Sequence, residues 1–265
     1  MTDGLRVTVF GLGEAGCIIA ADLVAAGVEV HAFDPRPVAT PAGVARFEVP
    51  ATAVVGAKFI CALTAAADAA GALGQALTAI EPGTVYADFA TSAAEAKQSL
   101  ATTAASVAIH FVDVALMAPV PGKGLRTPTL VSGTGAEEFL AAFGALGMPV
   151  ENAGNEAGAA ATRKLLRSVV IKGLAGVLIE AMHAARAAGL AEETWQSLVG
   201  QFAAADEDFL RRIVEGTGGH SLRRLHEMEA AAELLENLGV EPVMTRSTVE
   251  SLRRIEAGSP VPELP

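Results

Sequence analysis

The chain has 265 residues, enough for one large domain or two ordinary ones, and 51% of them are hydrophobic while 18% are charged. This composition excludes an intrinsically disordered chain. The formal net charge of −11 opposes nucleic-acid binding, because a protein that neutralises phosphates needs a basic surface. We therefore expect a globular protein without a nucleic-acid partner.

No basic segment followed by an apolar stretch precedes the first predicted strand, so we expect no signal peptide. The most apolar helical stretch, 169–182, carries Lys172 and Glu180 and is therefore excluded as a membrane span. Cys17 and Cys61 lie in apolar runs without CxxC spacing, which predicts buried, reduced thiols in a cytoplasmic protein. No His, Cys, Asp or Glu cluster has the spacing of metal ligands, so we expect no metal.

The first predicted elements form a strand–helix–strand unit, with a β-branched run that ends in glycines (6–16), a helix (17–27) and a second strand (28–34). Four further strands are predicted at 58–63, 84–89, 108–116 and 127–133. Helices are predicted between most of them, at 66–79, 93–103 and 136–147. This alternation predicts an α/β fold with a doubly wound parallel sheet.

The pattern changes near residue 154, after which no strand is predicted. Helical stretches are expected at 157–188, 192–214, 221–238 and 243–257. We therefore predict two domains, an α/β domain over 1–155 and an all-helical domain over 156–265.

A glycine motif, G-x-G-x-x-G, lies between the first strand and the first helix at Gly11, Gly13 and Gly16, and Asp34 ends the next strand. The first glycine permits a tight turn, the second allows a pyrophosphate close to the backbone, and the third allows close helix–strand packing. This context predicts a Rossmann-type dinucleotide site. The predicted cofactor contacts are Gly11, Leu12, Gly13, Glu14, Ala15, Gly16, Asp34, Arg36, Leu63, Thr64 and Thr91.

The choice between NAD and NADP depends on two residues. Asp34 can accept hydrogen bonds from an adenosine ribose and would repel a 2′-phosphate, which favours NAD. Arg36 could instead receive that phosphate, so NADP remains an alternative.

Four segments in order resemble the β-hydroxyacid dehydrogenase superfamily of 3-hydroxyisobutyrate and 6-phosphogluconate dehydrogenases: "VFGLGEAG", "VDVALMAPVPG", "GAAATRK" and "EMEAAAELLENLGVEP". Ala15 stands where the family usually has Met. Within the superfamily, "RKLLRSVVIKGLAGVLIEAM" and "RRLHEMEAAAELLENLGVEP" are most similar to the DUF1932 branch. The resemblance implies an NAD(P)-binding Rossmann domain, a helical substrate and dimerisation domain, and a homodimer.

The same resemblance places the family's catalytic lysine at Lys164. Arg167 and Ser168 stand where the family has two Asn residues that contact substrate. The apolar surroundings of Lys164 and the neighbouring cation Arg167 would favour the neutral form of the Lys164 amine, which can act as a general base. Arg167 could either bind a substrate carboxylate or pair with an acid on a neighbouring helix.

Other substrate-reading positions of the family are changed. Its carboxylate-binding Ser-Gly-Gly aligns with Met117, Ala118 and Pro119, and its Lys-Asp pair near the last helix aligns with His226 and Glu227. These changes argue against 3-hydroxyisobutyrate and 6-phosphogluconate as substrates. For the two helical residues, His226 and Glu227, an exposed surface role is the competing interpretation.

Lys164, Ser168 and Lys172 follow i, i+4, i+8 spacing and so share one face of the predicted helix. This face is expected to meet a polar cavity, although Lys172 could equally be a surface residue. Thr91 follows a strand and could touch cofactor or substrate, or else cap the next helix.

We therefore predict an NAD(P)-dependent dehydrogenase that acts on a hydroxyacid-type alcohol, with Lys164 as general acid and base. Two alternatives remain. One is an imine or keto-acid reductase on the same fold, although imine reductases usually lack the lysine. The other is a dinucleotide-binding sensor without turnover.

Overall fold

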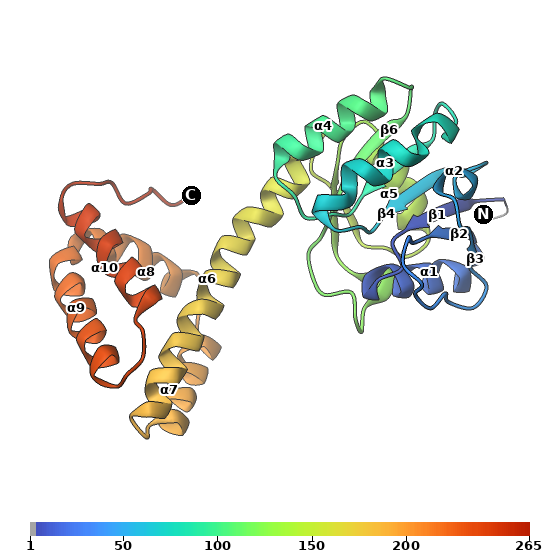
Figure 1. Cartoon of the computed structure of the whole chain (residues 1–265). Helices are drawn as coiled ribbons and strands as arrows, with labels where there is room; N and C mark the ends of the chain where they lie inside the picture. The colour runs from blue at the N-terminus through green and yellow to red at the C-terminus, as the bar shows by residue number, and fades with distance from the viewer. Residues whose placement is uncertain (1–3) are drawn as a thin grey trace. The chain divides into compact units, whose positions relative to one another are not determined.

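The computed structural model of the chain describes residues 4–265, which form two compact units. The sheet unit ends at Arg167, and the helical unit runs from Ser168 to Pro265. This division falls later than the predicted boundary between residues 155 and 156. The reason is that helix α6 (Ala159–Ala187) begins with turns whose backbone is hydrogen-bonded to the sheet unit (Figure 1).

The sheet has eight strands in the order β3-β2-β1-β4-β5-β6-β7-β8. They are β1 (Arg6–Phe10), β2 (Glu29–Phe33), β3 (Ala45–Arg46), β4 (Phe59–Ala62), β5 (Val85–Asp88), β6 (His110–Leu116), β7 (Thr129–Ser132) and β8 (Val150–Asn152). Strands β1 to β6 pair in parallel. The predicted Rossmann-type α/β fold is confirmed, and β3 and β8 are additions that the sequence did not predict.

The predicted parallel sheet has one antiparallel pairing, near one edge. Strand β7 runs antiparallel to β6, and β8 runs parallel to β7. A parallel neighbour would need a crossover, usually an α-helix. The connection between β6 and β7 contains only a short 3-10 turn, η3 (Gly124–Arg126), so the chain turns back beside its own strand.

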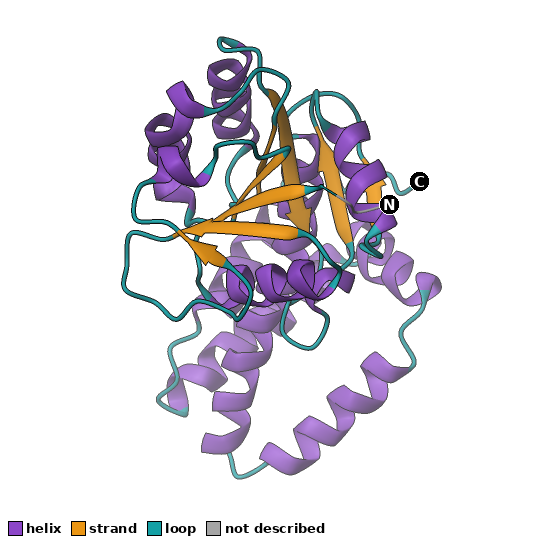
Figure 2. Ribbon diagram, turned by 90° about the vertical axis from the view of Figure 1, so that its right-hand side faces the viewer, coloured by secondary structure: helices purple, strands orange, loops and turns teal. Residues whose placement is uncertain are grey.

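Helices cover both faces of the sheet (Figure 2). They are α1 (Glu14–Ala25), α2 (Pro50–Ala53), α3 (Ala69–Ala76), α4 (Ala94–Ala105) and α5 (Ala136–Ala145), with 3-10 turns η1 (Ala66–Asp68) and η2 (Leu77–Ala79) around α3. Alternate residues of a strand enter opposite cores, as expected from the period of two. Phe59 and Cys61 of β4 pack in the core under α1 and α5, whereas Ile60 packs in the core under α2, α3 and α4.

The helical unit contains the rest of α6 followed by α7 (Ala191–Ala203), α8 (Glu207–Gly219), α9 (Ser221–Asn237) and α10 (Val243–Glu256). The prediction of one helix over 192–214 is wrong, because the helix is interrupted between the end of α7 and the start of α8. Asp206 explains the break, since its side chain accepts a hydrogen bond of 2.9 Å from the backbone N–H of Phe209 and so caps α8. Leu225, Val249 and Leu252 form the small core between α9 and α10.

Both cysteines are free; Cys61 is buried, whereas Cys17 is only half-buried. Burial raises the pKa of each thiol, so both are disfavoured as thiolates. Among residues 4–265, no helix is long and apolar enough to cross a bilayer.

Candidate functional site

The turn between β1 and α1 has a shape that its glycines make possible. Gly11 has a φ of +89°, and a Cβ there would lie 2.5 Å from the carbonyl oxygen of Leu63. A Cβ at Gly16 would collide with the carbonyl oxygen of Gly11, so this position requires glycine for close packing. A Cβ at Gly13 would meet nothing within 4 Å, which leaves open space beside the backbone. The three glycines therefore meet the three requirements of a dinucleotide loop.

Helix α1 begins directly after this open position. Its N-cap is Gly13, which provides no capping side chain, and Glu14 and Ala15 form part of the first turn. The first N–H groups of a helix have no partner within the helix, and the positive end of its dipole lies there. This helix start can therefore hold a pyrophosphate beside Gly13.

Asp34 and Arg36 lie just after β2 and contact each other through hydrogen bonds and an ion pair. The Asp34 side chain is 1% exposed and accepts hydrogen bonds from the backbone N–H groups of Leu12 (2.8 Å) and Arg36 (2.9 Å). The Arg36 guanidinium, whose side chain is 68% exposed, forms an ion pair of 3.3 Å with the same carboxylate. Burial opposes ionisation of Asp34, but the hydrogen bonds from Arg36 and Leu12 outweigh it and lower its pKa. Asp34 is therefore a carboxylate that also braces the glycine loop.

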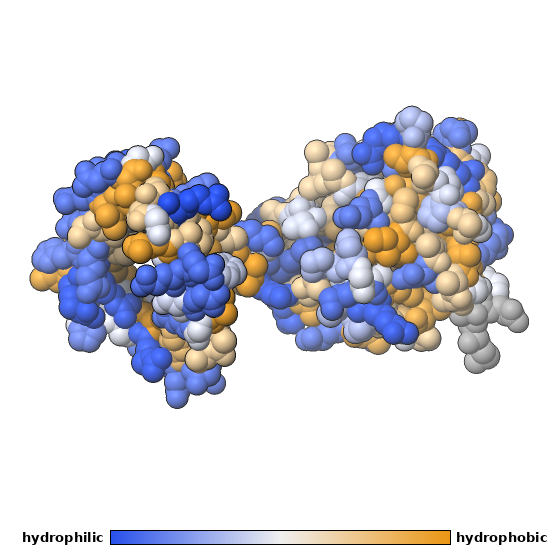
Figure 3. Space-filling model, turned by 90° about the horizontal axis from the view of Figure 1, so that it is seen from below, coloured by the Kyte–Doolittle hydropathy of each residue, from blue (hydrophilic) through white to orange (hydrophobic). Residues whose placement is uncertain are grey.

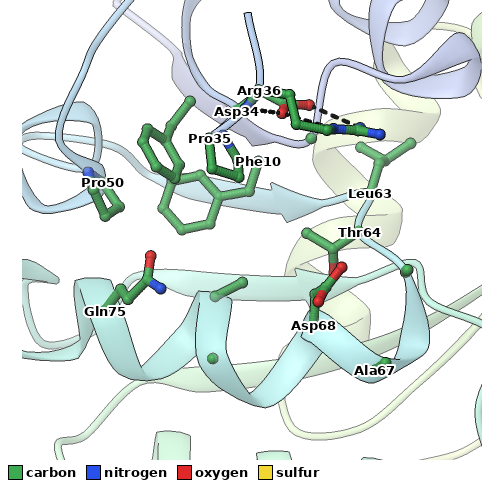
Figure 4. Close-up of a pocket in the computed structure, with 15 residues that line it drawn as sticks. Phe10, Asp34, Pro35, Arg36, Pro50, Leu63, Thr64, Ala67, Asp68 and Gln75 are labelled. Carbon is green, nitrogen blue, oxygen red and sulfur yellow. Dashed lines mark hydrogen bonds and ion pairs between the residues drawn. The ribbon is translucent and has the colours of Figure 1, made fainter.

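A pocket of about 400 Å³ opens between the ends of β1 and β2 and helix α3. Figure 4 shows Arg36 along one rim, with Thr64 and Asp68 across from it and Gln75 further along α3. The Thr64 hydroxyl oxygen is buried and, among the described residues, accepts or donates no hydrogen bond. The apolar lining of this pocket suits an adenine ring, and a ribose hydroxyl could form a hydrogen bond with Thr64. The residues present therefore fit a dinucleotide.

Lys164 lies on α6, in the part of the helix that belongs to the sheet unit. It is half-buried, and its Nζ is 2.9 Å from the hydroxyl oxygen of Thr91. Thr91 follows β5, at the carboxyl end of the parallel strands. Gly158 makes this approach possible, because a Cβ there would lie 2.8 Å from the Cα of Ala94 at the start of α4. Two helix starts therefore meet beside the Lys164–Thr91 pair.

The segment after β6 lies near this pair. Arg167 donates a hydrogen bond of 2.6 Å to the carbonyl oxygen of Met117, so α6 also contacts the position just after β6. Met117 and Ala118 are half-buried, and Pro119 is exposed. Thr64, Thr91 and Met117 thus follow three neighbouring parallel strands, β4, β5 and β6, at the sheet edge where ligands bind in open α/β folds.

The remaining predicted residues belong to the helical unit. Ser168 and Lys172 follow on α6, which is continuous, so the i+4 spacing from Lys164 is preserved along one side of the helix. Lys172 is exposed. His226 is an exposed residue of α9, and Glu227 forms an ion pair of 2.8 Å with Arg223 one turn earlier.

The sequence analysis missed a fully buried charge cluster next to the Lys164–Thr91 pair. The Nζ of Lys97 on α4 lies 2.7 Å from Asp88 Oδ2 and 3.0 Å from Asp113 Oδ1, and all three side chains are 0% exposed. The sequence signal was Lys97 itself, one of five lysines, placed one turn into a helix and three residues before the apolar Leu100. Among the described residues, no group of three or more His, Cys, Asp or Glu side chains could hold a metal ion.

Comparison with known proteins agrees with this geometry. Residues 6–142, more than half of the chain, match the family described as the NAD binding domain of 6-phosphogluconate dehydrogenase. Residues 185–255 match a domain of unknown function, DUF1932. An uncharacterized 28.5 kDa protein of Methanothermus fervidus is 30% identical over 146 residues, which are 55% of this chain and 57% of that relative. The chain therefore matches little more than half the length of that relative.

Solved structures extend the similarity across the chain. A conserved hypothetical protein of Sinorhizobium meliloti is 28% identical, with all of this chain and 92% of that chain covered and a TM-score of 0.62. An imine reductase of Streptomyces aurantiacus has 23% identity, coverage of 96% and 95%, and a TM-score of 0.77. A reductive aminase of Aspergillus terreus in complex with NADPH and ethyl levulinate has 18% identity, coverage of 98% and 96%, and a TM-score of 0.81.

The last two likenesses concern the fold alone, whereas the family match rests on the sequence of the nucleotide-binding half. The glycine loop, Asp34 and the pocket beside Thr64 lie within the matched residues 6–142. The chain therefore belongs to the NAD(P)-binding oxidoreductase family defined by the nucleotide-binding domain of 6-phosphogluconate dehydrogenase, and it carries a DUF1932 domain in its helical part.

Proposed function

We propose that the protein is an NAD(P)-dependent dehydrogenase of a small hydroxyacid-type alcohol, with Lys164 as the proton-transfer group. The observation that carries this proposal is the 2.9 Å contact between Lys164 Nζ and the Thr91 hydroxyl, at the same sheet edge as the glycine loop. A bound nicotinamide supplies the hydride acceptor or donor for such a reaction. The protein itself must then accept or donate one proton at the substrate oxygen.

Lys164 suits this role for two reasons. As a neutral amine, its Nζ would take the proton of a substrate hydroxyl, and as an ammonium it would return that proton to a carbonyl oxygen. The Thr91 hydroxyl holds Nζ at a fixed place after β5, while α6 holds the rest of the side chain. Such fixing is what general acid–base catalysis needs, because the transferring atom must lie within hydrogen-bond reach of the substrate.

For substrate recognition we propose a shell that differs from the dehydrogenases named above. Arg167 uses one N–H on the Met117 carbonyl, and its other N–H groups are suited to a carboxylate. Met117, Ala118 and Pro119 would supply an apolar wall. Ser168, Lys172, His226 and Glu227 complete the proposed substrate contacts.

The test is a panel of hydroxyacids and their oxo-acid partners, followed by nicotinamide absorbance at 340 nm. In Lys164→Met, turnover should fall by about 10²–10⁴-fold, the usual contribution of a positioned acid or base. Lys123→Met is the matched control, because Lys123 is an exposed lysine of the same unit. Turnover by Lys164→Met at the native rate would exclude Lys164 as the base.

A second candidate is an imine or keto-acid reductase. It is favoured by the imine reductase and reductive aminase folds, with TM-scores of 0.77 and 0.81, and by the apolar segment that follows β6. Cyclic imines with NADH or NADPH should be added to the same panel. Imine reduction that survives in Lys164→Met would favour this candidate over the dehydrogenase, and binding of a nicotinamide without turnover of any compound would favour the sensor.

We propose NAD as the preferred cofactor. The ionised Asp34 carboxylate would repel a 2′-phosphate, while Arg36 is already paired with that carboxylate. Fluorescence titration should therefore give tighter binding of NADH than of NADPH, and Asp34→Ser should narrow the difference by on the order of tenfold. A native protein that binds NADPH more tightly than NADH would contradict this proposal. Arg36 would then be the 2′-phosphate contact if Arg36→Ala weakens NADPH binding and leaves NADH binding unchanged.

We propose a homodimer, formed through the apolar side of α6. Val169 and Val170 are 72% and 65% exposed, and Trp195 on α7 is 48% exposed. Orange, hydrophobic residues are accordingly visible on the surface of the helical unit in Figure 3. Exposed apolar residues of this kind are suited to burial against a second copy of the same chain.

Sedimentation equilibrium provides the test of the dimer. The native protein should have the mass of two chains, and Val169→Glu should shift it toward one. Val49→Glu is the matched control, because Val49 is an exposed valine of the sheet unit. A native protein with the mass of one chain at micromolar concentration would exclude this interface.

For the organisation of the chain we propose that residues 1–155 bind the nucleotide and residues 156–265 contribute substrate contacts and the dimer surface. We also propose a cytoplasmic location, which is supported by the two free cysteines.

A further inference from the structure

The Lys97 ammonium is enclosed by protein on all sides. Its Nζ donates to Asp88 Oδ2 at 2.7 Å and to the Asp88 carbonyl oxygen at 2.9 Å, and it forms an ion pair of 3.0 Å with Asp113. Removing three charges from water costs several kcal/mol per ion, and only close pairing offsets that cost. Such a cluster is often no more stabilising than apolar side chains of similar volume, so stability alone does not explain why it lies at this position.

One carboxylate of the cluster is connected to the segment that carries Thr91. The second oxygen of Asp88 accepts a hydrogen bond of 3.3 Å from the backbone N–H of Ala90, which directly precedes Thr91. Lys97 itself lies one turn into α4, the helix that begins just after Thr91. The pair of Asp88 and Lys97 therefore fixes both ends of the turn that presents the Thr91 hydroxyl.

The other carboxylate is connected to the start of α6. Asp113 Oδ2 accepts a hydrogen bond of 2.8 Å from the backbone N–H of Ala161, and the Ser132 hydroxyl lies 3.5 Å from the same oxygen. The Ser132 oxygen accepts from the N–H of Ala160 at 3.0 Å. Two N–H groups at the start of the helix, which helices leave without internal partners, are thus bound by side chains of β6 and β7. Lys164 follows Ala161 by one turn.

The charges of this arrangement are balanced by the helix. One ammonium faces two carboxylates, and the positive end of the α6 dipole meets the oxygen of Asp113 that Lys97 does not contact. Burial raises the pKa of Asp88, while Lys97 opposes the effect. Lys97 is therefore the cation that favours the ionised form of Asp88.

We propose that Lys97, with Asp88 and Asp113, is a positioning group that sets the contact between Thr91 and Lys164. Lys97 binds Asp88, which is connected to the segment of Thr91, and Asp113, which is connected to the start of the helix that carries Lys164. The hydrogen bond between Lys164 and Thr91 then joins these two segments directly. The inference deepens the proposed function, and only its catalytic consequence rests on that function. The placement of Lys164 can be measured without any substrate.

The experiment uses ¹³C-dimethylated lysines in the full chain, observed by NMR. The chain has only five lysines, so the Lys164 signal can be assigned by its loss in Lys164→Arg. Thr91→Val defines the shift of a Lys164 that has lost its hydroxyl partner. The exposed Lys123 provides an internal control signal in every sample.

The informative variants weaken the cluster in a graded way. Asp113→Asn keeps an acceptor for Ala161 and leaves Lys97 paired with Asp88. Ser132→Ala removes the acceptor of the Ala160 N–H and the weak contact with Asp113 without changing charge. In both, the Lys164 signal should move in the direction given by Thr91→Val while the Lys123 signal stays in place. In Ser132→Ala, exchange of the Ala160 amide, which loses its acceptor, should become about tenfold faster, the size expected for one lost hydrogen bond.

Lys97→Arg and Lys97→Met complete the series. The arginine should retain part of the native Lys164 shift, and the methionine should lose it, although Lys97→Met could fail to fold because it leaves two buried carboxylates without a cation. In that case Asp113→Asn and Ser132→Ala still decide the question. Folded variants that lose stability with an unchanged Lys164 signal would overturn the positioning role. Native turnover by Lys164→Met would instead contradict the proposed function alone.

Discussion

The two units of the chain bury their apolar residues very differently. In the sheet unit, large side chains such as Phe139 and Phe143 of α5 are 0% exposed and stack on each other at 4.0 Å between ring centroids. In the helical unit, the buried core cluster consists of Leu225, Val249 and Leu252, which retain 5–8% exposure, and the other buried hydrophobic residues are Ala184, Ala185 and Leu235. The sheet unit therefore supplies its own core, whereas the helical unit leaves large apolar side chains such as Val169, Val170 and Trp195 exposed.

This difference matches the division of tasks that we propose. The nucleotide loop and the Lys164–Thr91 pair lie on a densely packed frame, where a displacement of a side chain is resisted by its neighbours. The helical unit offers exposed apolar residues that a second copy would bury. Under the dimer proposal, the sheet unit owes its stability to its own packing and the helical unit owes part of its stability to assembly.

The chain contains a separate optical probe for each unit. Tyr86, the only tyrosine, is fully buried in β5, and Trp195, the only tryptophan, is half exposed on α7. Denaturation followed by each probe can therefore report each unit by itself, which is necessary because two units need not unfold in one step.

The largest expected effect is the removal of an aromatic ring from the sheet unit. Phe139→Ala deletes a ring that contacts Phe59, Phe89 and Phe143, and it should lower the free energy of unfolding by about 3–5 kcal/mol. Urea denaturation followed by Tyr86 fluorescence provides the measurement.

The matched control for Phe139→Ala is Phe202→Ala, on an α7 phenylalanine that is 42% exposed. At concentrations where the protein is a single chain, this change should stay within about 0.5 kcal/mol. Equal losses for the two variants would remove the contrast between the units.

The next effect distinguishes packing from binding within the nucleotide loop. Gly16→Ala places a methyl group against the Gly11 carbonyl and should cost about 1–3 kcal/mol of stability. Gly13→Ala, where a Cβ meets open space, should leave the melting temperature nearly unchanged and weaken NADH binding. Thermal denaturation and NADH titration on both variants separate the two, and weak NADH binding with unchanged stability in Gly16→Ala would contradict the packing role.

The sequence predicted the local features of the fold well because each depends on neighbouring residues. The glycine-rich turn after β1 and the alternation of strands and helices are properties of short segments, and the family match covers the same residues. The break between α7 and α8 also had a local signal, because Asp206 is followed by two acids in the first turn. That signal was outweighed by a helical pattern that continued on both sides.

Features that depend on distant residues could not be predicted. The antiparallel pairing of β7 follows from how a twelve-residue connection turns back, and the sequence of that connection does not specify its direction. The cluster of Lys97, Asp88 and Asp113 brings together positions from three separate elements. Asp113 was identified only as part of a motif, because its partner on α6, Ala161, provides nothing but a backbone N–H.

A smaller effect tests how the helical unit holds its own helices. Glu180 of α6 accepts hydrogen bonds from the Met244 and Thr245 backbone N–H groups at the start of α10 (2.7 and 2.9 Å). Burial opposes its ionisation, but the hydrogen bonds from Thr245 and the backbone outweigh it and lower its pKa below the usual 4.5. Glu180→Gln should therefore cost about 1–2 kcal/mol at pH 7, by loss of charge at a helix N-terminus.

The pH dependence gives the sign of this contribution. A carboxyl group whose pKa is lowered on folding stabilises the folded state above its unfolded pKa, and that stability is lost as the pH falls through the lowered value. The difference between native protein and Glu180→Gln should therefore be largest near neutral pH and shrink below about pH 4.5. Trp195 fluorescence in urea at several pH values measures it, and a difference that grows on acidification would be the opposite result.

The smallest effect concerns the break between α7 and α8, where the sequence analysis expected one helix. Asp206→Ala removes the side-chain acceptor of the Phe209 N–H and should lower stability by about 1 kcal/mol, the typical value of an N-cap. Asp206→Asn is the matched control, because an amide oxygen can still cap the helix, and it should lose far less. Alanine also favours helix, so an Asp206→Ala variant that gains helical content by circular dichroism without losing stability would mean that α7 and α8 fuse. In that case the break would be a weak local preference, and the helical unit would be held together less firmly than its capped helices indicate.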